Sequence, residues 1–313
     1  MKALLIVIAL VLSGITNNNL ISAADHSDID SPMTDSIVAG GPEQPCPPDF
    51  HGVPADQFQG CFDYWTKQGR WPVTLSAFQS VASGKVQTYF SGSFQPGANR
   101  PVRTLMTSQQ FQQYFDSYLK QGFRPEQKDV LETNSGPLFT VIWAPNNSPF
   151  ESRHGLTQEQ FITKWKEMQG AGWVNIDVTP YREGKSTMFS AVWVKRPTSG
   201  YATYIDMTDA DYRAKFDQFY KAGYRLTRFV AYKKFTGDPS FNPGTAAAAF
   251  LYAIAKLETR YAAIWEKIPG GYYHYYNLTQ PQYKARYDQV TAQGFHLSHV
   301  STLGDRVSAI WVK

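Results

Sequence analysis

The sequence predicts an α/β (α+β) repeat protein, in which about five helix–strand–strand units form a largely antiparallel curved sheet with the helices on one face. Three observations predict this fold. A helix-capping position is followed fifteen residues later by glycine at five places; each glycine precedes an alternating apolar and polar stretch; and a second apolar stretch then ends at tryptophan in four copies. Such repeats share one core. The sequence leaves open an arc, a half-barrel or a closed ring.

The helix of each unit is predicted by its cap, its aromatic face and its final glycine. In the copy at residues 208–223, Thr208 can cap the helix, and Tyr212, Phe216 and Phe219 share one face at a period of 3.6 residues. Gly223 can adopt the left-handed conformation in which helices commonly end. The other copies run from Pro54 to Gly69, Thr107 to Gly122, Thr157 to Gly172 and Thr279 to Gly294.

Two strands are predicted after each helix. Period-two alternation follows the glycine, as in residues 224–232 and 295–300, and a polar turn such as 182–185 comes next. The second strands share a signature and occupy residues 139–143, 189–193, 261–265 and 307–311, with a weaker version at 86–90. We expect most of their terminal tryptophans to pack between adjacent repeats.

The fourth repeat contains an insertion between its two strands, from Phe235 to about Thr259. Its second half, Thr245 to Lys256, is alanine-rich and predicts a capped helix. The helix is more apolar than an exposed helix needs, so one interpretation is a lid or a docking helix, with self-association through residues 236–258. The other interpretation, which we favour from the sequence, is a helix that covers a sheet edge or the end of the core.

The N-terminus has the pattern of a secretory signal peptide at residues 1–24, followed by a polar, flexible leader at 25–44. The rest, 45–313, is expected to be a single domain with repeats at about 45–100, 101–150, 151–200, 201–270 and 271–313. No later apolar stretch is long enough for a membrane span. The formal net charge of +4 is too small and dispersed to indicate nucleic-acid binding. We therefore expect a secreted, extracellular protein.

Two features agree with export. Cys46 and Cys61 are the only cysteines, and an even pair in an exported chain favours a disulfide bond, with two buried free thiols as the alternative. Asn277 and Asn146 begin glycosylation sequons, although Pro149 weakens the second.

No catalytic residue, cofactor or metal site is assigned from the sequence. Ser117 and Lys120 match S-x-x-K, but they fall in the last turn of a helix and no partner motif exists. His296 and His299 lie three apart on a strand and would face opposite sides of the sheet unless a bulge intervenes. The histidines expected just before helices, His154 and His274, would need distant repeats to converge.

The sheet face without helices is the expected binding surface, because concave faces of repeat proteins commonly bind ligands. Residues that differ from copy to copy are better candidates there than repeated ones, which report packing. The candidates are Asn175, Asp177, Arg225, Arg228, His296 and His299.

The runs LTQEQF…GAGW…FSAVWVK and MTDADY…KAGY…YAAIWEK resemble the bacterial tandem repeat of secreted proteins, which also forms the N-terminal domain of fungal polyglycine hydrolases. The resemblance covers about residues 50–313 and implies the repeat fold. In those hydrolases the chemistry belongs to a separate β-lactamase-like domain, which we expect to be missing here because the repeats reach the end of the sequence. The resemblance therefore implies a fold more than an activity.

The sequence thus favours a secreted, non-catalytic binding or interaction protein that uses the exposed sheet face or ring lumen. Its expected partners are an extracellular peptide, glycan or small molecule. The alternative is a secreted enzyme, a hydrolase or other, with an active site built from non-repeated residues in the lumen. A toxin or structural secretion that self-associates through the insertion is a third hypothesis.

Overall fold

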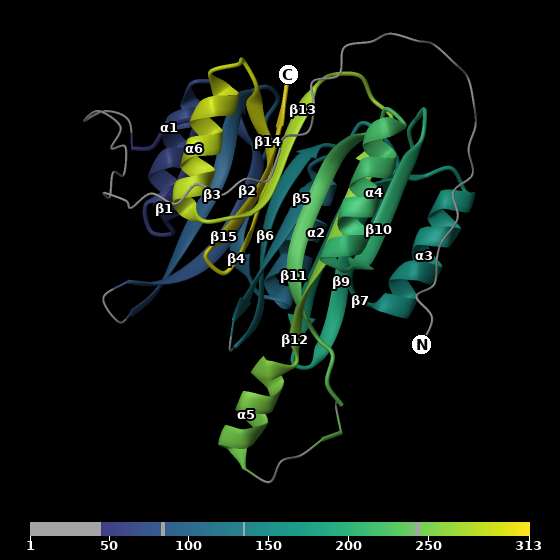
Figure 1. Cartoon of the computed structure of the whole chain (residues 1–313). Coiled ribbons are helices and arrows are strands. Elements are labelled where there is room, and N and C mark those ends of the chain that lie inside the picture. Colours follow the sequence, from purple (N-terminus) through teal and green to yellow (C-terminus); the bar gives the residue numbers. More distant parts are fainter. Residues whose placement is uncertain (1–44, 83–84, 134, 239, 242–244) are drawn as a thin grey trace.

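The computed structural model describes residues 45–313 except 83–84, 134, 239 and 242–244 (Figure 1). The expected signal peptide at 1–24 and leader at 25–44 lie outside the described residues. None of the described helices combines the length and apolarity needed to cross a membrane.

Each repeat consists of a strand, a helix and two further strands. The bounds are β1 (Asp49–Pro54), α1 (Phe58–Lys67), β2 (Arg70–Ala82) and β3 (Lys85–Pro96); β4 (Val102–Met106), α2 (Ser108–Lys120), β5 (Phe123–Thr133) and β6 (Gly136–Pro145); β7 (Phe150–Thr157), α3 (Gln158–Gly170), β8 (Val174–Glu183) and β9 (Ser186–Val194); β10 (Tyr201–Met207), α4 (Asp209–Lys221), β11 (Arg225–Phe235), α5 (Ala246–Ala255) and β12 (Leu257–Glu266); β13 (Tyr272–Leu278), α6 (Gln280–Thr291), β14 (His296–Leu303) and β15 (Arg306–Val312).

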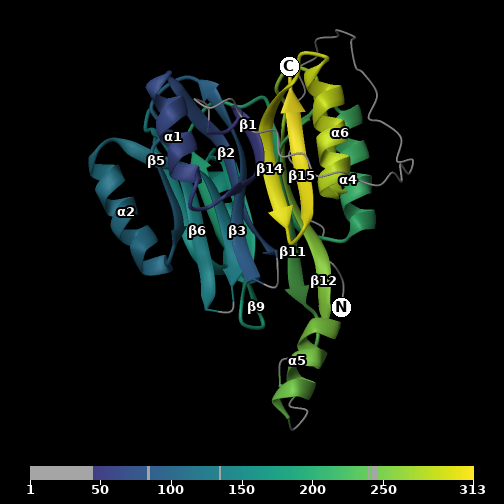
Figure 2. The same ribbon diagram turned by 90° about the vertical axis from the view of Figure 1, so that its left-hand side faces the viewer.

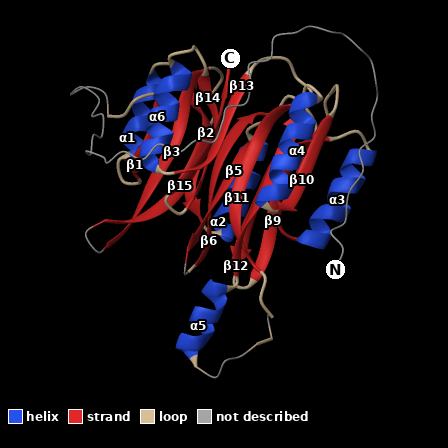
Figure 3. Cartoon of the chain, in the orientation of Figure 1, coloured by secondary structure: helices blue, strands red, loops and turns tan. Residues whose placement is uncertain are grey.

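The predicted repeats and antiparallel pairing are confirmed, and the structure adds a strand before each helix. The three strands of a repeat form their own sheet, in which the last strand lies between the first and the second. The chain therefore forms five separate three-stranded sheets in place of one continuous sheet, each with a helix on its outer side (Figure 3).

Each added strand carries a bulge that turns the chain into the helix. One residue of every such strand has a positive φ, between 53° and 73°, and the pairing register shifts there. Glycine, asparagine and aspartate tolerate this conformation best. The five positions are Gly52, Leu105, Gly155, Asp206 and Asn277.

The expected helix caps are confirmed in four repeats. Thr107, Thr157, Thr208 and Thr279 each accept a hydrogen bond from the backbone N–H three residues on and take part in a capping box. The first repeat differs, because Pro54 ends β1 and α1 starts later, at Phe58, without a side-chain cap.

The core of each repeat lies between its helix and its sheet. Trp143, Trp193, Trp265 and Trp311 are fully buried. Each packs against an aromatic ring of its own helix, as Trp265 does against Phe219 at 5.0 Å between ring centroids. The expectation that most of these tryptophans pack between repeats is therefore wrong; other residues link the cores, such as Tyr232 of the fourth repeat within the core of the third.

The five repeats close into a ring through the strand that follows the main helix of each repeat. The strands β2, β5, β8, β11 and β14 contact one another in that order, and β14 returns to β2. There, the backbone N–H groups of Val300 and Thr302 donate to Thr74 Oγ1 and Ser76 Oγ at 3.0 and 3.1 Å. Among the shapes left open by the sequence, the repeats adopt a ring, while the sheets remain separate and do not join into a barrel.

The strands β2, β5, β8, β11 and β14, which we call the inner strands, run parallel to one another. The contacts between neighbours join equivalent positions of each repeat: residue 75 contacts residue 127, residue 128 contacts residue 177, and residue 300 contacts residue 74. The turns between second and third strands therefore emerge together at one end of the ring, which we call the hairpin end.

The insertion in the fourth repeat forms an arm at the hairpin end. Its helix α5 is capped by Thr245, as predicted, and ends one residue before Lys256. The helix projects away from the sheets (Figures 1 and 2), and among the described residues its Tyr252 ring meets Phe235 at the end of β11. The favoured interpretation, a helix that covers a sheet edge or core, is therefore wrong.

A disulfide joins Cys46 to Cys61, as expected, with a Cα–Cα distance of 5.6 Å. Cys61 lies on α1, so the bond fixes the chain entering the first repeat to its helix.

Candidate functional site

A set of polar residues lies where the inner strands meet at the centre of the ring. Each inner strand has a bulge near its start, and the residue after the bulge is buried, with at most 6% of its surface exposed. We call these the ring residues. They are Thr74, Gln127, Asp177, Arg228 and His299, one from each repeat.

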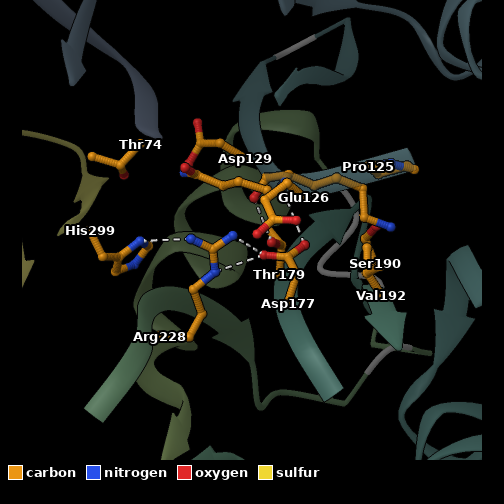
Figure 4. Close-up of polar contacts among 12 residues, drawn as sticks. Thr74, Pro125, Glu126, Asp129, Asp177, Thr179, Ser190, Val192, Arg228 and His299 are labelled. Atoms are coloured by element: carbon orange, nitrogen blue, oxygen red, sulfur yellow. Dashed lines mark hydrogen bonds and ion pairs between the residues drawn. The ribbon is translucent and has the colours of Figure 1, made fainter. Parts of the chain in front are cut away.

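Three ring residues form a connected polar chain (Figure 4). The Arg228 guanidinium donates to Asp177 Oδ1 through Nε, at 2.8 Å, and through Nη2. Its Nη1 lies 2.9 Å from His299 Nδ1. Because arginine can only donate, Nδ1 accepts, and Nε2–H donates to the Phe229 carbonyl at 2.7 Å. Burial, together with the nearby Arg228, holds the pKa of His299 well below its usual value, so the imidazole is neutral.

Groups from the two neighbouring repeats contact the Asp177 carboxylate. The backbone N–H of Lys128 donates to Oδ2 at 3.2 Å, opposite the Arg228 contact. Complete burial raises the pKa of Asp177, although Arg228 and Lys128 counteract that effect. Arg228 and the Lys128 N–H, in place of water, are therefore the groups that stabilise the charged form of this carboxylate.

The buried amine of Lys128 is the most unusual group near the centre. Burial lowers its pKa to about 7. Its Nζ donates to three oxygens at 3.0 to 3.1 Å, which belong to Ser152, Arg153 and Ala191. Three acceptors match the three N–H bonds of an ammonium group, so the lysine ties the second repeat to the third.

The first and second repeats are joined in a similar way. Gln127 exchanges two hydrogen bonds with the backbone of Leu75, at 3.2 and 2.9 Å. The Asp129 carboxylate accepts from Ser76 Oγ and from the Ala77 N–H. Although part of the Asp129 residue is exposed, its carboxylate is enclosed by protein, and burial raises its pKa to about 7.

The structure brings three of the six candidates together and separates the others. Asp177, Arg228 and His299 meet at the ring centre. Asn175 is buried elsewhere, where it bonds to two carbonyls and to Thr203. Arg225 is half-buried and donates to the Pro269 carbonyl, and His296 is exposed. A role of these residues in ligand binding stays a prediction. Because Asp177, Arg228 and His299 are buried, a ligand could reach them only if the ring opened.

The bulges change which residues share a face. His296 pairs opposite Val312 and His299 opposite Ile310, so the bulge between them puts both histidines on the same face of the sheet. The expectation of opposite faces, which assumed no bulge, is therefore wrong. They still form no common site, because His296 is exposed and His299 is buried.

Sequence reasoning missed Thr74, Gln127, Lys128 and Asp129. A signal was available, since every ring residue stands five positions after the glycine that ends its helix. Reading this position in all five copies would have found Thr74 and Gln127. The partners Lys128 and Asp129 follow directly after Gln127 in β5.

The remaining sequence candidates lie apart from the ring centre. Ser117 is exposed, and its Oγ accepts from Gln121 and has no bond to Lys120. His154 and His274 lie on strands β7 and β13, in separate repeats. Asn277 is exposed and Asn146 half-buried, so glycosylation stays a prediction.

One shallow depression among the described residues lies away from the ring centre. It measures about 410 Å³, lies against α3 and is lined by Gln158, Glu159, Ile162, Thr163 and Lys166. No group of three or more potential metal ligands occurs among the described residues. The geometry at the centre suits holding repeats together, because every polar group named there bonds to a neighbouring repeat or to its own strand.

Comparison with known proteins agrees with this repeat architecture. A family model described as polyglycine hydrolase-like, structural repeat matches five times, at residues 50–95, 102–146, 147–196, 198–268 and 269–313. No curated protein matches the chain. Each match contains one strand–helix–strand–strand unit of the ring. The chain therefore belongs to the polyglycine hydrolase-like structural repeat family.

Proposed function

We propose that this chain is a secreted, non-catalytic interaction protein, in which the ring is a rigid scaffold and extracellular partners bind to its outside. The observation that carries this proposal is the use of the ring residues. The ring residues differ from repeat to repeat, as the residues of a specialised site would. They are nevertheless buried and bonded to neighbouring repeats. A catalytic group has to reach its substrate.

Two further features support the proposal. The Cys46–Cys61 disulfide is consistent with an oxidising, extracellular environment. The family description itself refers to a structural repeat. The expected partner is a peptide or a glycan, because such extended molecules can bind to a broad outer surface, whereas small molecules usually need an enclosed pocket.

The rival function is an enzyme with its site at the ring centre. One observation favours it, because a buried lysine with a pKa near neutrality, as in Lys128, is typical of catalytic sites. The three acceptors around its Nζ give a structural explanation for the same lysine. We therefore rank the scaffold above the enzyme.

The test is to incubate the purified protein with a panel of extracellular glycans and peptides, and to measure binding and turnover in the same samples. We expect saturable binding without turnover. A folded Lys128→Met variant, checked by circular dichroism and gel filtration, should bind as the wild type does. Turnover by the wild type that disappears in Lys128→Met would overturn the proposal and support the enzyme.

A further inference from the structure

The arm at the hairpin end exposes more apolar surface than its surroundings. By the arm we mean the described residues between 236 and 256. Its helix α5 reads AAAAFLYAIA, without a charged residue on any side. Leu251, Ile254 and Phe241 expose 66, 51 and 47% of their surfaces. A helix that is apolar all round normally lies in a protein core or in lipid. None of the five hydrophobic cores among the described residues includes a residue of α5.

The arm is nevertheless held in a defined position. The Tyr252 ring packs against Phe241, with ring centroids 4.5 Å apart, and its centroid lies 6.1 Å from that of Phe235 at the end of β11. Its hydroxyl accepts a hydrogen bond from the Asp238 N–H at 2.8 Å. At the base, the Thr236 N–H donates to the Lys256 carbonyl at 2.9 Å. Since Tyr252 satisfies these inward contacts, Leu251 and Ile254 remain on the outside.

Positive charge lies at the base of the arm. The segment from 233 to 260 contains four cationic side chains, those of Lys233, Lys234, Lys256 and Arg260, and two carboxylates. One of these carboxylates, Glu258, pairs with Arg260 at 2.6 Å. Lys234 and Arg260 also pair with Asp206 of β10, so Lys233 and Lys256 are the two that form no ion pair with a described carboxylate. From the next hairpin, the Lys185 ammonium lies 5.7 Å from the Phe235 ring centroid. The arm thus has an uncharged helix and a cationic base.

We propose that the arm docks on the surface of a lipid bilayer that contains anionic headgroups. Leu251, Ile254 and Phe241 enter the acyl region, while Lys233 and Lys256 stay among the phosphates. The ten residues of α5 measure about 15 Å, half of a hydrocarbon core of about 30 Å, so the helix reaches into one leaflet only.

The charge pattern favours lipid over a protein groove. A helix that docks into a groove keeps a polar face toward solvent, and α5 has none. The cationic base complements anionic headgroups, which attract basic residues within about a Debye length. This inference rests on the proposed function only in that the ring serves as the scaffold carrying the arm.

Co-sedimentation of the whole protein with vesicles tests the proposal. The vesicles contain phosphatidylcholine alone or phosphatidylcholine mixed with phosphatidylglycerol. We expect the wild type to bind the mixed vesicles, and Leu251→Asp/Ile254→Asp to bind them about tenfold less or weaker still. The matched control is Leu119→Asp, because Leu119 is 43% exposed on α2, near the opposite end of its repeat. It should bind as the wild type does.

Three further measurements test the role of the cationic side chains and the insertion of the helix into the bilayer. Lys233→Glu/Lys256→Glu should weaken binding to the mixed vesicles, and added salt should weaken wild-type binding. A Leu251→Trp variant should shift its fluorescence to shorter wavelength with mixed vesicles, since its indole would enter an apolar medium.

Three outcomes would overturn the inference. The first is a wild type that fails to bind the mixed vesicles, and the second is a Leu251→Asp/Ile254→Asp variant that binds them as the wild type does. The third outcome is a wild-type dimer that the same double change converts to a monomer, which would assign the arm to a second copy of the chain. None of these outcomes involves turnover, so failure here is distinguishable from failure of the proposed function.

Discussion

Arg228 is the residue whose removal tests the ring centre most severely. Its guanidinium contacts Asp177 of the third repeat and His299 of the fifth, so one side chain joins three repeats. Arg228→Met keeps most of the side-chain volume and removes both contacts. It leaves the Asp177 carboxylate, which has no exposed surface, with the Lys128 N–H and no cation in direct contact.

The magnitude follows from this burial. Removing one partner of a buried ion pair costs about 3–5 kcal/mol, because the remaining charge is neither hydrated nor compensated. That is a large part of the total stability of a domain, about 5–15 kcal/mol. Arg228→Met/Asp177→Leu removes both charges, so we expect it to cost less than Arg228→Met alone.

The assay is urea unfolding near neutral pH and again at about pH 5. Without Arg228, burial raises the pKa of Asp177 further above its unfolded value. A raised pKa in the folded state favours folding at low pH and loses that contribution as pH rises, so the deficit of Arg228→Met should be smaller at about pH 5. The control is Arg225→Met on the same strand, which loses one exposed hydrogen bond and at most about 1 kcal/mol. Equal costs for the two variants would refute the reasoning.

Three further predictions concern single features. Burial raises the pKa of Asp129 to about 7, so the stability that this group contributes should be lost as pH rises from about 4 to about 7. The urea midpoint of Asp129→Asn, relative to the wild type, should therefore rise over that range; parallel profiles would contradict this. Replacing Cys46 and Cys61 by serine removes a cross-link between residues 15 positions apart and should lower the free energy of unfolding by about 3 kcal/mol. An unchanged free energy of unfolding after reduction of the wild type would contradict this. Thr208→Ala removes a helix cap and should lower the stability measured by urea unfolding by about 1 kcal/mol, whereas Thr163→Ala, at an exposed position within α3, should change it little.

Local periodicity was enough to predict the helices and the last two strands of each repeat. The caps at Thr107, Thr157, Thr208 and Thr279, the aromatic faces and the strand signatures all act over a few residues, and sequence alone records such patterns.

The first strand of each repeat was not predictable in the same way. The strand β10 pairs with β12, where Tyr201 lies opposite Glu266, so its partner is more than sixty positions away. Its alternation is also interrupted by the left-handed residue Asp206. A short strand with a bulge and a distant partner has little periodicity of its own.

The candidate site was half predictable for a related reason. Asp177, Arg228 and His299 were chosen because they are polar and differ between copies, and these three do meet. Simple alternation puts Asn175 on the same face as Asp177, but the bulge between them separates the two: they pair with the consecutive residues Trp193 and Val192. Bulge positions depend on packing around the ring, which no single repeat encodes.

The closure of the fifth repeat onto the first is the central claim, and an engineered cross-link tests it most directly. Ser76 Oγ and Thr302 Oγ1 lie 2.9 Å apart although 226 positions separate them. Ser76→Cys/Thr302→Cys should form a disulfide within one monomer under mild oxidation, seen by mass and gel mobility. The control pair Ser76→Cys/Thr179→Cys, from the first and third repeats, should not. If the first pair stays reduced, or links only between molecules, the repeats do not form this ring.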